Sequence, residues 1–231
     1  MWLLWPLDGR EIAVVEIPIL YEDNHLLVVT KPSGILSQAD RTGAPDLLSL
    51  LKADLKQRRH KPGAVFLGLV HRLDRPVGGV MVFARTSKAA SRLSEQIRNR
   101  AFQKIYLARV NGCPVPADST LEHYLVKDRQ TLRVRVVEPD VPDAKRALLT
   151  YHVEATRGGV SRVRIDLHTG RPHQIRVQLA AIGCPLIGDS KYGPAGGAQA
   201  EGPIALWANE IRFQHPTTRE PLSFQAPPPW T

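Results

Sequence analysis

Cysteine is almost absent from this chain of 231 residues. Cys113 and Cys184 are the only two, they lie far apart, and they form no Cys-x-x-Cys pair. Neither a disulfide framework nor a thiolate metal site is therefore indicated. This cysteine usage fits a reducing compartment, and we expect a cytoplasmic protein.

A long hydrophobic run is also lacking. The chain opens with the apolar stretch MWLLWPL, but no basic leader precedes it, Pro6 interrupts it, and charged residues follow directly. A membrane helix needs about 20 apolar residues, and a signal peptide has a basic start. We expect no membrane association, and we treat residues 1–20 as an N-terminal extension of a single domain at residues 21–231.

Several catalytic motifs are missing as well. The sequence contains no phosphate-binding loop, no G-x-G-x-x-G, no G-x-S-x-G elbow and no H-E-x-x-H. Nucleotide hydrolysis, dinucleotide chemistry, serine-esterase and zinc-protease activities therefore lack their residues. His168 and His173 are five positions apart, but nothing obvious completes a metal shell around them. We expect neither a metal nor a cofactor.

Positive charge is what the chain has in excess. Lys and Arg number 31 against 22 acidic residues, which gives a formal net charge of +9 and a pI near 9.9. Such an excess favours a polyanionic partner, nucleic acid first, although a generally basic surface without a specific partner is the alternative. The candidates for phosphate contacts are Lys56, Arg58, Arg59, Lys61, Arg98, Arg100 and Lys104.

Hydrophobic periodicity predicts three helices. Leu47, Leu51 and Leu55 recur at helical spacing, with basic residues towards the end of the segment. Thr86 is an N-cap candidate for a second helix, and the third is expected over the segment RPHQIRVQLAAIG, which ends at Gly183. These spacings are typical of amphipathic helices with ordinary start and stop signals.

Strand patterns dominate the second half of the chain. The segments KIYLARVNG, TLRVRVVEP, ALLTYHVEAT and VSRVRIDLHTG alternate apolar and polar residues, and residues 157–159 predict a hairpin between the last two. Another hairpin is expected around HPTT, and the continuous apolar runs AVFLGLV and GGVMVFART predict buried central strands. The fold class is α+β: one domain with a mixed, largely antiparallel central sheet flanked by helices and loops.

A single carboxylate, Asp74, lies between Arg72 and Arg75 where one apolar run ends and the next begins, within GLVHRLDRPVGGVMVFARTSK. Asp is a common turn residue, and the Arg-Pro-Val-Gly-Gly that follows is turn chemistry as well. The local pattern alone thus favours a structural role, and a functional role needs support from the rest of the chain.

Four segments in order supply that support: YEDNHLLVVTKPSG, HRLDRPVGGVMVFARTSKAA, FQKIYLARVNG and LHTGRPHQIRVQLAAIGCPLIGDSKYG. Together they resemble the RluA family of pseudouridine synthases, which isomerise uridine to its C-glycoside within RNA. The resemblance extends from about Tyr21 to about Pro228, and the HRLD block is its most specific part. It implies that residues 21–231 form a pseudouridine-synthase-type catalytic domain.

The resemblance also implies residue roles. Asp74 corresponds to the catalytic carboxylate, Tyr106 to the ring that packs on the target uracil, and Arg176 to the arginine that pairs with Asp74. Arg72 is implied to reach into the RNA where the target base has left. Further RNA contacts are expected from the same segments, at His71, Arg75, Lys104, Arg171, His173 and Gln174.

The chain departs from the family pattern at a few positions. Many members have Thr-Ser-Gly where this chain has Val77, Gly78 and Gly79, and many have His where Gln178 and Trp207 stand. None of these changes removes a group with a catalytic role in the family. The first alters the turn beside Asp74, so it bears on which RNA is chosen.

The function predicted from the sequence is a cofactor-independent RNA pseudouridine synthase that acts on tRNA or rRNA, as a monomer by default. The carboxylate attacks or stabilises the sugar carbon, or a base removes a sugar proton instead, and the sequence leaves both routes open. An arginine beside the carboxylate favours its charged form in either route. The alternatives are an RNA-binding protein on the same scaffold and, less favoured because no motif places a second carboxylate, a glycosidase.

Overall fold

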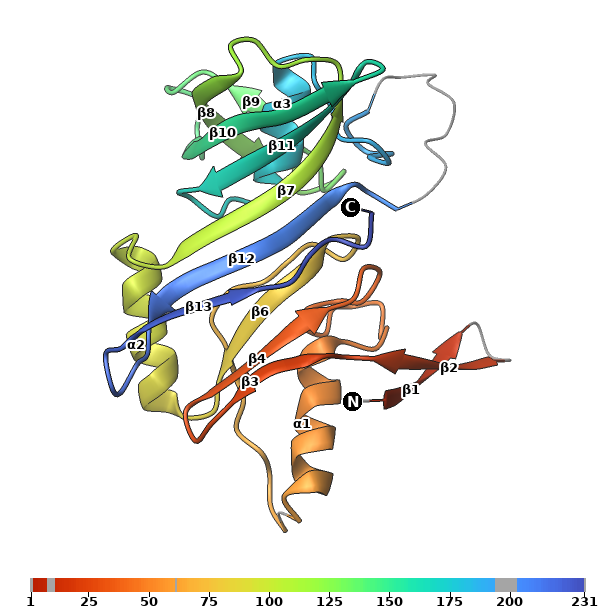
Figure 1. Ribbon diagram of the computed structural model, residues 1–231, viewed down its shortest axis with the longest axis vertical. Coiled ribbons are helices and arrows are strands. Elements are labelled where there is room, and N and C mark those ends of the chain that lie inside the picture. The colour runs from red at the N-terminus through yellow and green to blue at the C-terminus, as the bar shows by residue number, and fades with distance from the viewer. Residues whose placement is uncertain (1, 8–10, 61, 194–202, 231) are drawn as a thin grey trace. The chain divides into compact units, whose positions relative to one another are not determined.

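The structure is a computed structural model that describes residues 2–7, 11–60, 62–193 and 203–230 (Figure 1). The chain divides into two compact units. The first unit comprises Met1–Phe102 and Glu210–Pro227, and the second comprises Gln103–Asn209 and Pro228–Thr231.

The first unit contains an antiparallel sheet in which β3, β4 and β6 are neighbours in that order, and β5 pairs with the end of β6. A separate two-stranded sheet forms at the N-terminus, and a hairpin around HPTT forms near the C-terminus, as predicted. The strands are β1 (Trp2–Leu7), β2 (Glu11–Glu16), β3 (Ile19–Glu22), β4 (Leu26–Lys31), β5 (Gly68–Leu69), β6 (Gly78–Ala84) and β13 (Pro221–Gln225), together with the part of β12 (Leu206–Gln214) that begins at Glu210. The boundary at residue 20 between an extension and a domain stays a prediction, and β3 already begins at Ile19.

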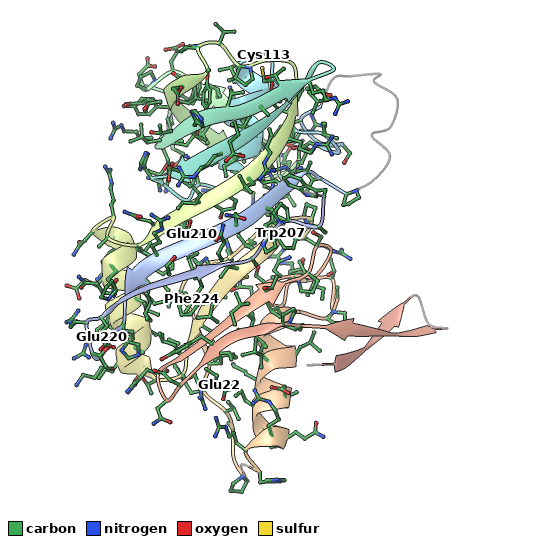
Figure 2. The ribbon with its side chains drawn as sticks, viewed as in Figure 1. Glu22, Cys113, Trp207, Glu210, Glu220 and Phe224 are labelled. Atoms are coloured by element: carbon green, nitrogen blue, oxygen red, sulfur yellow. The ribbon has the colours of Figure 1, made fainter. Side chains whose placement is uncertain are left out.

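The core of the first unit is built on β4 and β6. All seven residues of β6 are buried, as expected for a strand that is covered on both faces. Aromatic side chains close one side of this core: the rings of Phe102 and Phe213 stack 5.0 Å apart, and Phe224 (Figure 2) lies 5.4 Å from Tyr21. The contact between Tyr21 and Phe224 joins the β12–β13 hairpin to the β3–β4 hairpin within the unit.

Two helices accompany this sheet, and the second begins at the predicted cap, Thr86. Helix α1 (Leu47–Arg58) buries Leu47, Leu51 and Leu55, and helix α2 (Ser87–Arg98) packs on β6. Each has a side-chain cap: Asp46 accepts a hydrogen bond from the amide of Ser49, and Thr86 accepts one from the amide of Ala89. These caps satisfy amides that have no partner inside the helix.

One strand prediction in the first unit was wrong. AVFLGLV, at residues 64–70, was expected to form a buried central strand, but only Gly68 and Leu69 form a strand there, and Phe66 is half exposed. The run has the right composition, but only its last part lies beside a strand with which it can pair, here β6.

The second unit is an antiparallel sheet in the order β7-β11-β10-β8-β9 with one helix, α3, on β8 and β9 (Figure 1). The hairpin predicted at residues 157–159 is confirmed, with Gly158 and Gly159 in the left-handed conformation that glycine adopts easily. The elements are β7 (Gln103–Asn111), β8 (Asp118–Lys127), β9 (Val134–Val137), β10 (Lys145–Arg157), β11 (Val160–Leu167) and α3 (Gln174–Ala181).

The α+β class and the largely antiparallel sheet with flanking helices are confirmed. Helix α3 is shorter than expected, because the left-handed backbone of His173, with φ +53°, delays its start and leaves Pro172 outside the helix. Within the described residues, no helix is long and apolar enough to cross a membrane.

Asp46→Ala should lower the free energy of unfolding by about 1 kcal/mol, because the Ser49 amide loses its capping partner at the start of α1. Asp46→Asn keeps an acceptor oxygen and is the matched control, with most of the stability retained. Urea denaturation of both variants measures this. Equal losses in the two variants would contradict the capping role.

Candidate active site

Asp74 lies in the loop between β5 and β6 of the first unit, directly before β6 begins at Gly78. The amide of Val77 donates to the carbonyl of Asp74 at 3.0 Å, which closes a turn over the Arg-Pro segment. This is the turn that the composition predicted. Leu73 and Val77 are buried on either side of it, Arg72 and Arg75 are exposed, and Asp74 is half-buried. The turn therefore has two apolar anchors, with the aspartate held between them.

Ser37 binds both backbone polar groups of Leu73, the residue before Asp74. Its hydroxyl donates to the carbonyl of Leu73 at 2.8 Å and accepts from the amide of Leu73 at 3.1 Å. At His71, three residues before Asp74, Nε2 accepts a hydrogen bond from the amide of Val82 at 3.1 Å, which connects the loop to β6. Hydrogen bonds from Ser37 and His71 thus fix the backbone next to Asp74.

Lys31, the last residue of β4, is fully buried beneath this turn. Its ammonium donates to the carbonyl of Pro32 at 3.0 Å and to the carbonyl of Arg75 at 3.2 Å. The carbonyl of Arg75 also accepts from the amide of Gly34 at 2.8 Å, and Nε of Arg75 donates to the carbonyl of Gly34 at 3.0 Å. The KPSG turn and the HRLDR turn, which are separate motifs in the sequence, are therefore joined by three hydrogen bonds.

The charge of Lys31 is balanced against Asp74. Burial lowers the pKa of the Lys31 ammonium from its usual 10.5 to about 7, while the negative charge of Asp74 raises it. Burial disfavours the charged form because it removes water, and a nearby opposite charge restores part of the loss. Asp74 therefore has a cationic neighbour within its own unit, which the sequence analysis did not predict.

Tyr106 lies on β7 of the second unit, opposite Ile165 of β11, and its side chain is buried. Lys104 lies two positions earlier on the same strand and so projects from the same face. The Lys104 ammonium lies 3.3 Å from where a side chain on Gly170 would begin, so the glycine leaves room for it. Burial lowers the pKa of Lys104. Tyr106, Lys104 and the turn before α3 thus meet in one part of this unit.

Arg176 lies on α3 and makes a two-pronged ion pair with Asp189. Its Nε and Nη2 groups donate to the two carboxylate oxygens at 2.8 and 2.7 Å, and both side chains are buried. The guanidinium also lies over the ring of Tyr192, 5.1 Å from its centre. Burial raises the pKa of Asp189, but Arg176 and the backbone amides of Lys191 and Tyr192 outweigh it and hold that pKa below its usual value.

Arg176 and Asp74 belong to different units, and the pairing that we predict between them stays a prediction. The same holds for a site shared by Asp74 and Tyr106. What the structure adds is that Arg176 has a carboxylate partner within its own unit. No sequence signal identified Asp189, which lies 13 residues after Arg176 outside any strand or helix.

The residues predicted from the LHTGRPHQIR segment are used partly inside the protein. The side-chain amide of Gln174 donates to the carbonyl of Leu148 and to Gln178, and its oxygen accepts from Thr169 and from the Arg171 amide. This network orders the turn before α3. The RNA contact expected of Gln174 is untested.

The neighbouring residues of this segment differ in exposure. His173 is half-buried, with Nδ1 2.6 Å from the hydroxyl of Tyr192. Arg171 is exposed, and its Nε donates to the carbonyl of Arg146. Arg171 keeps most of its guanidinium towards solvent and remains the better placed of the two for a phosphate.

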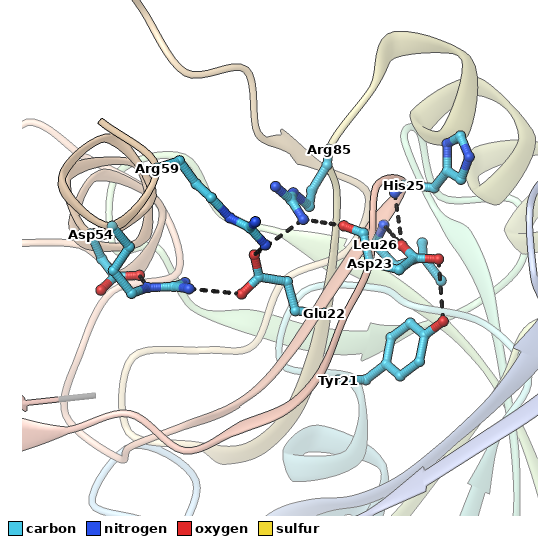
Figure 3. A network of polar contacts seen from close by, with 9 residues as sticks. Tyr21, Glu22, Asp23, His25, Leu26, Asp54, Arg59 and Arg85 are labelled. Carbon is cyan, nitrogen blue, oxygen red and sulfur yellow. Dashed lines mark hydrogen bonds and ion pairs between the residues drawn. The ribbon is translucent and has the colours of Figure 1, made fainter. Parts of the chain in front are cut away.

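The basic residues proposed for phosphate contacts fall into two groups. Arg58 and Arg59, at the end of α1, both bind Glu22 (Figure 3). Arg98 and Arg100 are exposed near the end of α2, Lys56 is exposed on α1, and Lys61 lies outside the described residues. Net charge predicted the partner class, but it could not say which cations already have carboxylate partners.

Among the described residues, no three or more His, Cys, Asp or Glu side chains gather into a group that could hold a metal ion. Cys113 and Cys184 are both free thiols. His168 is hydrogen-bonded to Thr150 at 2.9 Å.

Residues 25–181 match the family model described as RNA pseudouridylate synthase. An uncharacterized RNA pseudouridine synthase of Bacillus subtilis, YhcT, is 35% identical over 93% of this chain and 69% of its own length. Ribosomal large subunit pseudouridine synthase D of Xanthomonas campestris is 34% identical over 93% of this chain and 67% of its length. The dual-specificity RNA pseudouridine synthase RluA of Salmonella typhi is 33% identical over 90% of this chain and 92% of its length.

Solved structures agree on the fold. Human RNA pseudouridylate synthase domain containing 4 superposes with a TM-score of 0.76 at 24% identity, over 92% of this chain and 89% of its own. Human RNA pseudouridylate synthase domain containing 1 superposes with a TM-score of 0.75 at 25% identity, over 94% and 85%. The predicted pseudouridine-synthase-type fold is confirmed.

The stability of the wild type relative to Lys31→Met should rise with pH between about 7 and 10.5. In this window the unfolded chain still binds the Lys31 proton and the folded chain has released it, so the difference grows by at most about 1.4 kcal/mol per pH unit. In an Asp74→Asn background the rise should begin at lower pH, because the charge that raises the Lys31 pKa is gone. Urea denaturation at pH 6 to 9 measures both. A difference that stays flat with pH would contradict the burial of a titrating ammonium.

Proposed function

The chain belongs to the RluA family of RNA pseudouridine synthases, and on this basis we propose that its isomerase reaction depends on the carboxylate of Asp74. The substrate is RNA and the reaction is an isomerisation: the bond from the ribose carbon to N1 of uracil breaks, and a bond from the same carbon to C5 forms. The C5 hydrogen leaves as a proton and N1 gains one, so no oxidant or reductant is required.

The buried Lys31 ammonium is the observation that supports this role most directly. The charge of Asp74 raises the pKa of a fully buried ammonium, so the carboxylate lies within electrostatic reach of that group. A carboxylate can attack or stabilise a cationic sugar carbon. The hydrogen bonds of Ser37 to Leu73 fix the backbone next to this carboxylate. A carboxylate on a backbone held in position loses little freedom when it meets the substrate.

Three further steps complete the proposal. The target uridine leaves the RNA stack, at a cost of a few kcal/mol that contacts to the rest of the RNA offset. Tyr106 packs on the extruded uracil, and Arg176 pairs with Asp74 once its pair with Asp189 has fixed the guanidinium. Arg72, exposed beside Asp74, enters the place that the base has left. His71, Arg75, Lys104, Arg171 and His173 supply further contacts to the RNA.

The RNA is proposed to be ribosomal or transfer RNA. The relative from Xanthomonas campestris is named a ribosomal large subunit synthase, and the one from Salmonella typhi is named a dual-specificity synthase. The chain is proposed to act as a monomer in the cytoplasm, where such RNA is found. Both cysteines being free supports a reducing compartment.

Asp74→Asn should reduce release of tritium from C5-labelled rRNA and tRNA transcripts by at least about a thousand-fold, because the group that acts on the sugar carbon is lost. RNA affinity, measured by filter binding, should change little. Asp140→Asn removes an exposed turn carboxylate and is the matched control, with wild-type release expected. Retained turnover in Asp74→Asn would overturn the catalytic assignment.

The same incubation separates the alternatives. Tritium release with unchanged RNA length indicates isomerisation, free uracil indicates glycosidic hydrolysis, and binding with neither product indicates an RNA-binding protein without catalysis. RNA length and free uracil are read by gel electrophoresis and chromatography of the same samples. Either of the last two results would contradict the proposal.

Tyr106→Leu should slow tritium release much more than Tyr106→Phe. Leucine removes the ring on which the uracil is proposed to stack, worth about 1 to 3 kcal/mol, whereas phenylalanine keeps the ring and removes only the hydroxyl. Single-turnover rates with excess enzyme measure the difference, and thermal unfolding of both variants checks the fold. Equal rates in Tyr106→Leu and the wild type would exclude stacking at this ring.

A further inference from the structure

A basic pocket lies in the first unit, at the end of β6 that is remote from Asp74. Lys31, beneath the Asp74 turn, pairs with Gly79 near the start of β6, and Arg85 follows six residues later. At about 3.3 Å per residue this separates the two ends by about 20 Å. The far end holds a pocket of about 320 Å³, lined in part by Arg59, Arg85 and Phe66. The catalytic proposal assigns this pocket no role.

The charge around this pocket is unbalanced. Three guanidinium groups, those of Arg58, Arg59 and Arg85, converge on the single carboxylate of Glu22 (Figure 3). Burial raises the pKa of Glu22, but hydrogen bonds from Arg59 and Arg58 outweigh it and keep that pKa below its usual value. Asp54 pairs with Arg58, so two negative charges face three positive ones.

The donors of this cluster are only partly used. The side chain of Arg59 is 51% exposed, and a guanidinium has five N–H donors. None of the eight residues that line the pocket is acidic. The pocket therefore offers hydrogen-bond donors and a net positive charge to an anion.

The start of α2 adds to this preference. Thr86, its N-cap, lines the pocket, and the first turn of the helix contains no acidic residue. The N-terminus of a helix carries a partial positive charge that favours phosphate. Arginine side chains and the helix terminus thus favour the same class of ligand from two directions.

Phe66 adds an exposed aromatic ring to this pocket. Four large hydrophobic side chains are exposed in the described part of the chain, and Phe66, 50% exposed, is the only aromatic one. A single exposed hydrophobic residue needs no explanation by itself. An exposed aromatic face next to guanidinium groups in a hollow is the arrangement that binds an unpaired base with its phosphate.

We propose that this pocket binds one unpaired nucleotide of the substrate RNA, with the base stacked on Phe66 and the phosphate on Arg59 and Arg85. Its volume is at the small end of the range for ligand pockets, which suits one nucleotide and not a duplex. This rests on RNA being the substrate, as proposed above, but not on the role of Asp74. The site acts in RNA choice and affinity and takes no part in bond breaking.

A weak contact at this distance still raises RNA affinity because the RNA is already held at the Asp74 turn. RNA held at the Asp74 turn presents a nucleotide about 20 Å away at an effective concentration in the millimolar range. One stacked base and one phosphate then add to affinity without the full cost of a separate binding event. RNAs with an unpaired nucleotide at this spacing from the target uridine would therefore bind better than those without one.

The test uses a fluorescein-labelled 12-residue oligouridylate and fluorescence anisotropy. Phe66→Ala should weaken binding about ten-fold, Phe66→Trp should keep or improve it, and Phe66→Leu should resemble Phe66→Ala because leucine has no stacking face. Arg59→Gln should weaken binding more than Arg129→Gln, which removes the same charge at an exposed turn of the second unit. Thermal unfolding identifies any variant that fails to fold.

Ultraviolet crosslinking of the same oligonucleotide gives a second, independent readout. Mass spectrometry should find uridine attached to the peptide that contains Phe66. Wild-type affinity in Phe66→Ala, or crosslinks confined to other peptides, would overturn the pocket assignment. Asp74→Asn should keep both the affinity and the crosslink, so a failure of the catalytic assignment is distinguishable from a failure of this one.

Discussion

The buried ammonium of Lys31 is the constraint on which the Asp74 turn depends. A lysine without water needs other oxygen atoms around its charge, and here the carbonyls of Pro32 and Arg75 supply them, with the carboxylate of Asp74 adding its field. Because those carbonyls belong to two different turns, both turns must be folded before the lysine is satisfied. The energetic cost of burying one cation thereby specifies the geometry of the loop that carries the aspartate.

The second unit uses a related device for Arg176. A buried ion pair contributes little net stability, since desolvation opposes the Coulomb attraction, but it fixes geometry. Asp189 engages Nε and one Nη group of a guanidinium that has five N–H donors, so this pair and the pair predicted with Asp74 do not exclude each other. The pair with Asp189 thus sets the direction of the guanidinium within the second unit.

Local patterns predicted the elements that depend on local physics. The spacing of Leu47, Leu51 and Leu55 predicted α1, and Thr86 predicted the start of α2, because helix periodicity and caps involve residues near in sequence. The strand predicted at residues 64–70 was wrong because pairing depends on the position of another strand, β6, which the local sequence does not show. Lys31 and Asp189 were missed for the same reason: nothing near them in the sequence shows that they are buried.

The net charge likewise could not show which basic side chains already have carboxylate partners. The burial of each ion pair then decides how easily its arginine can bind a phosphate instead. Arg146 and Glu122 form a pair in which both side chains are nearly half exposed, and such pairs contribute little, so a phosphate can replace the carboxylate at small cost. Glu22 is more buried, so replacing this carboxylate with a phosphate would cost more if a single arginine were its partner. It has three, so Arg59 and Arg85 can turn donors to a phosphate while Arg58 still holds Glu22. An excess of cations around one carboxylate therefore leaves a basic cluster available to RNA even though every member is paired.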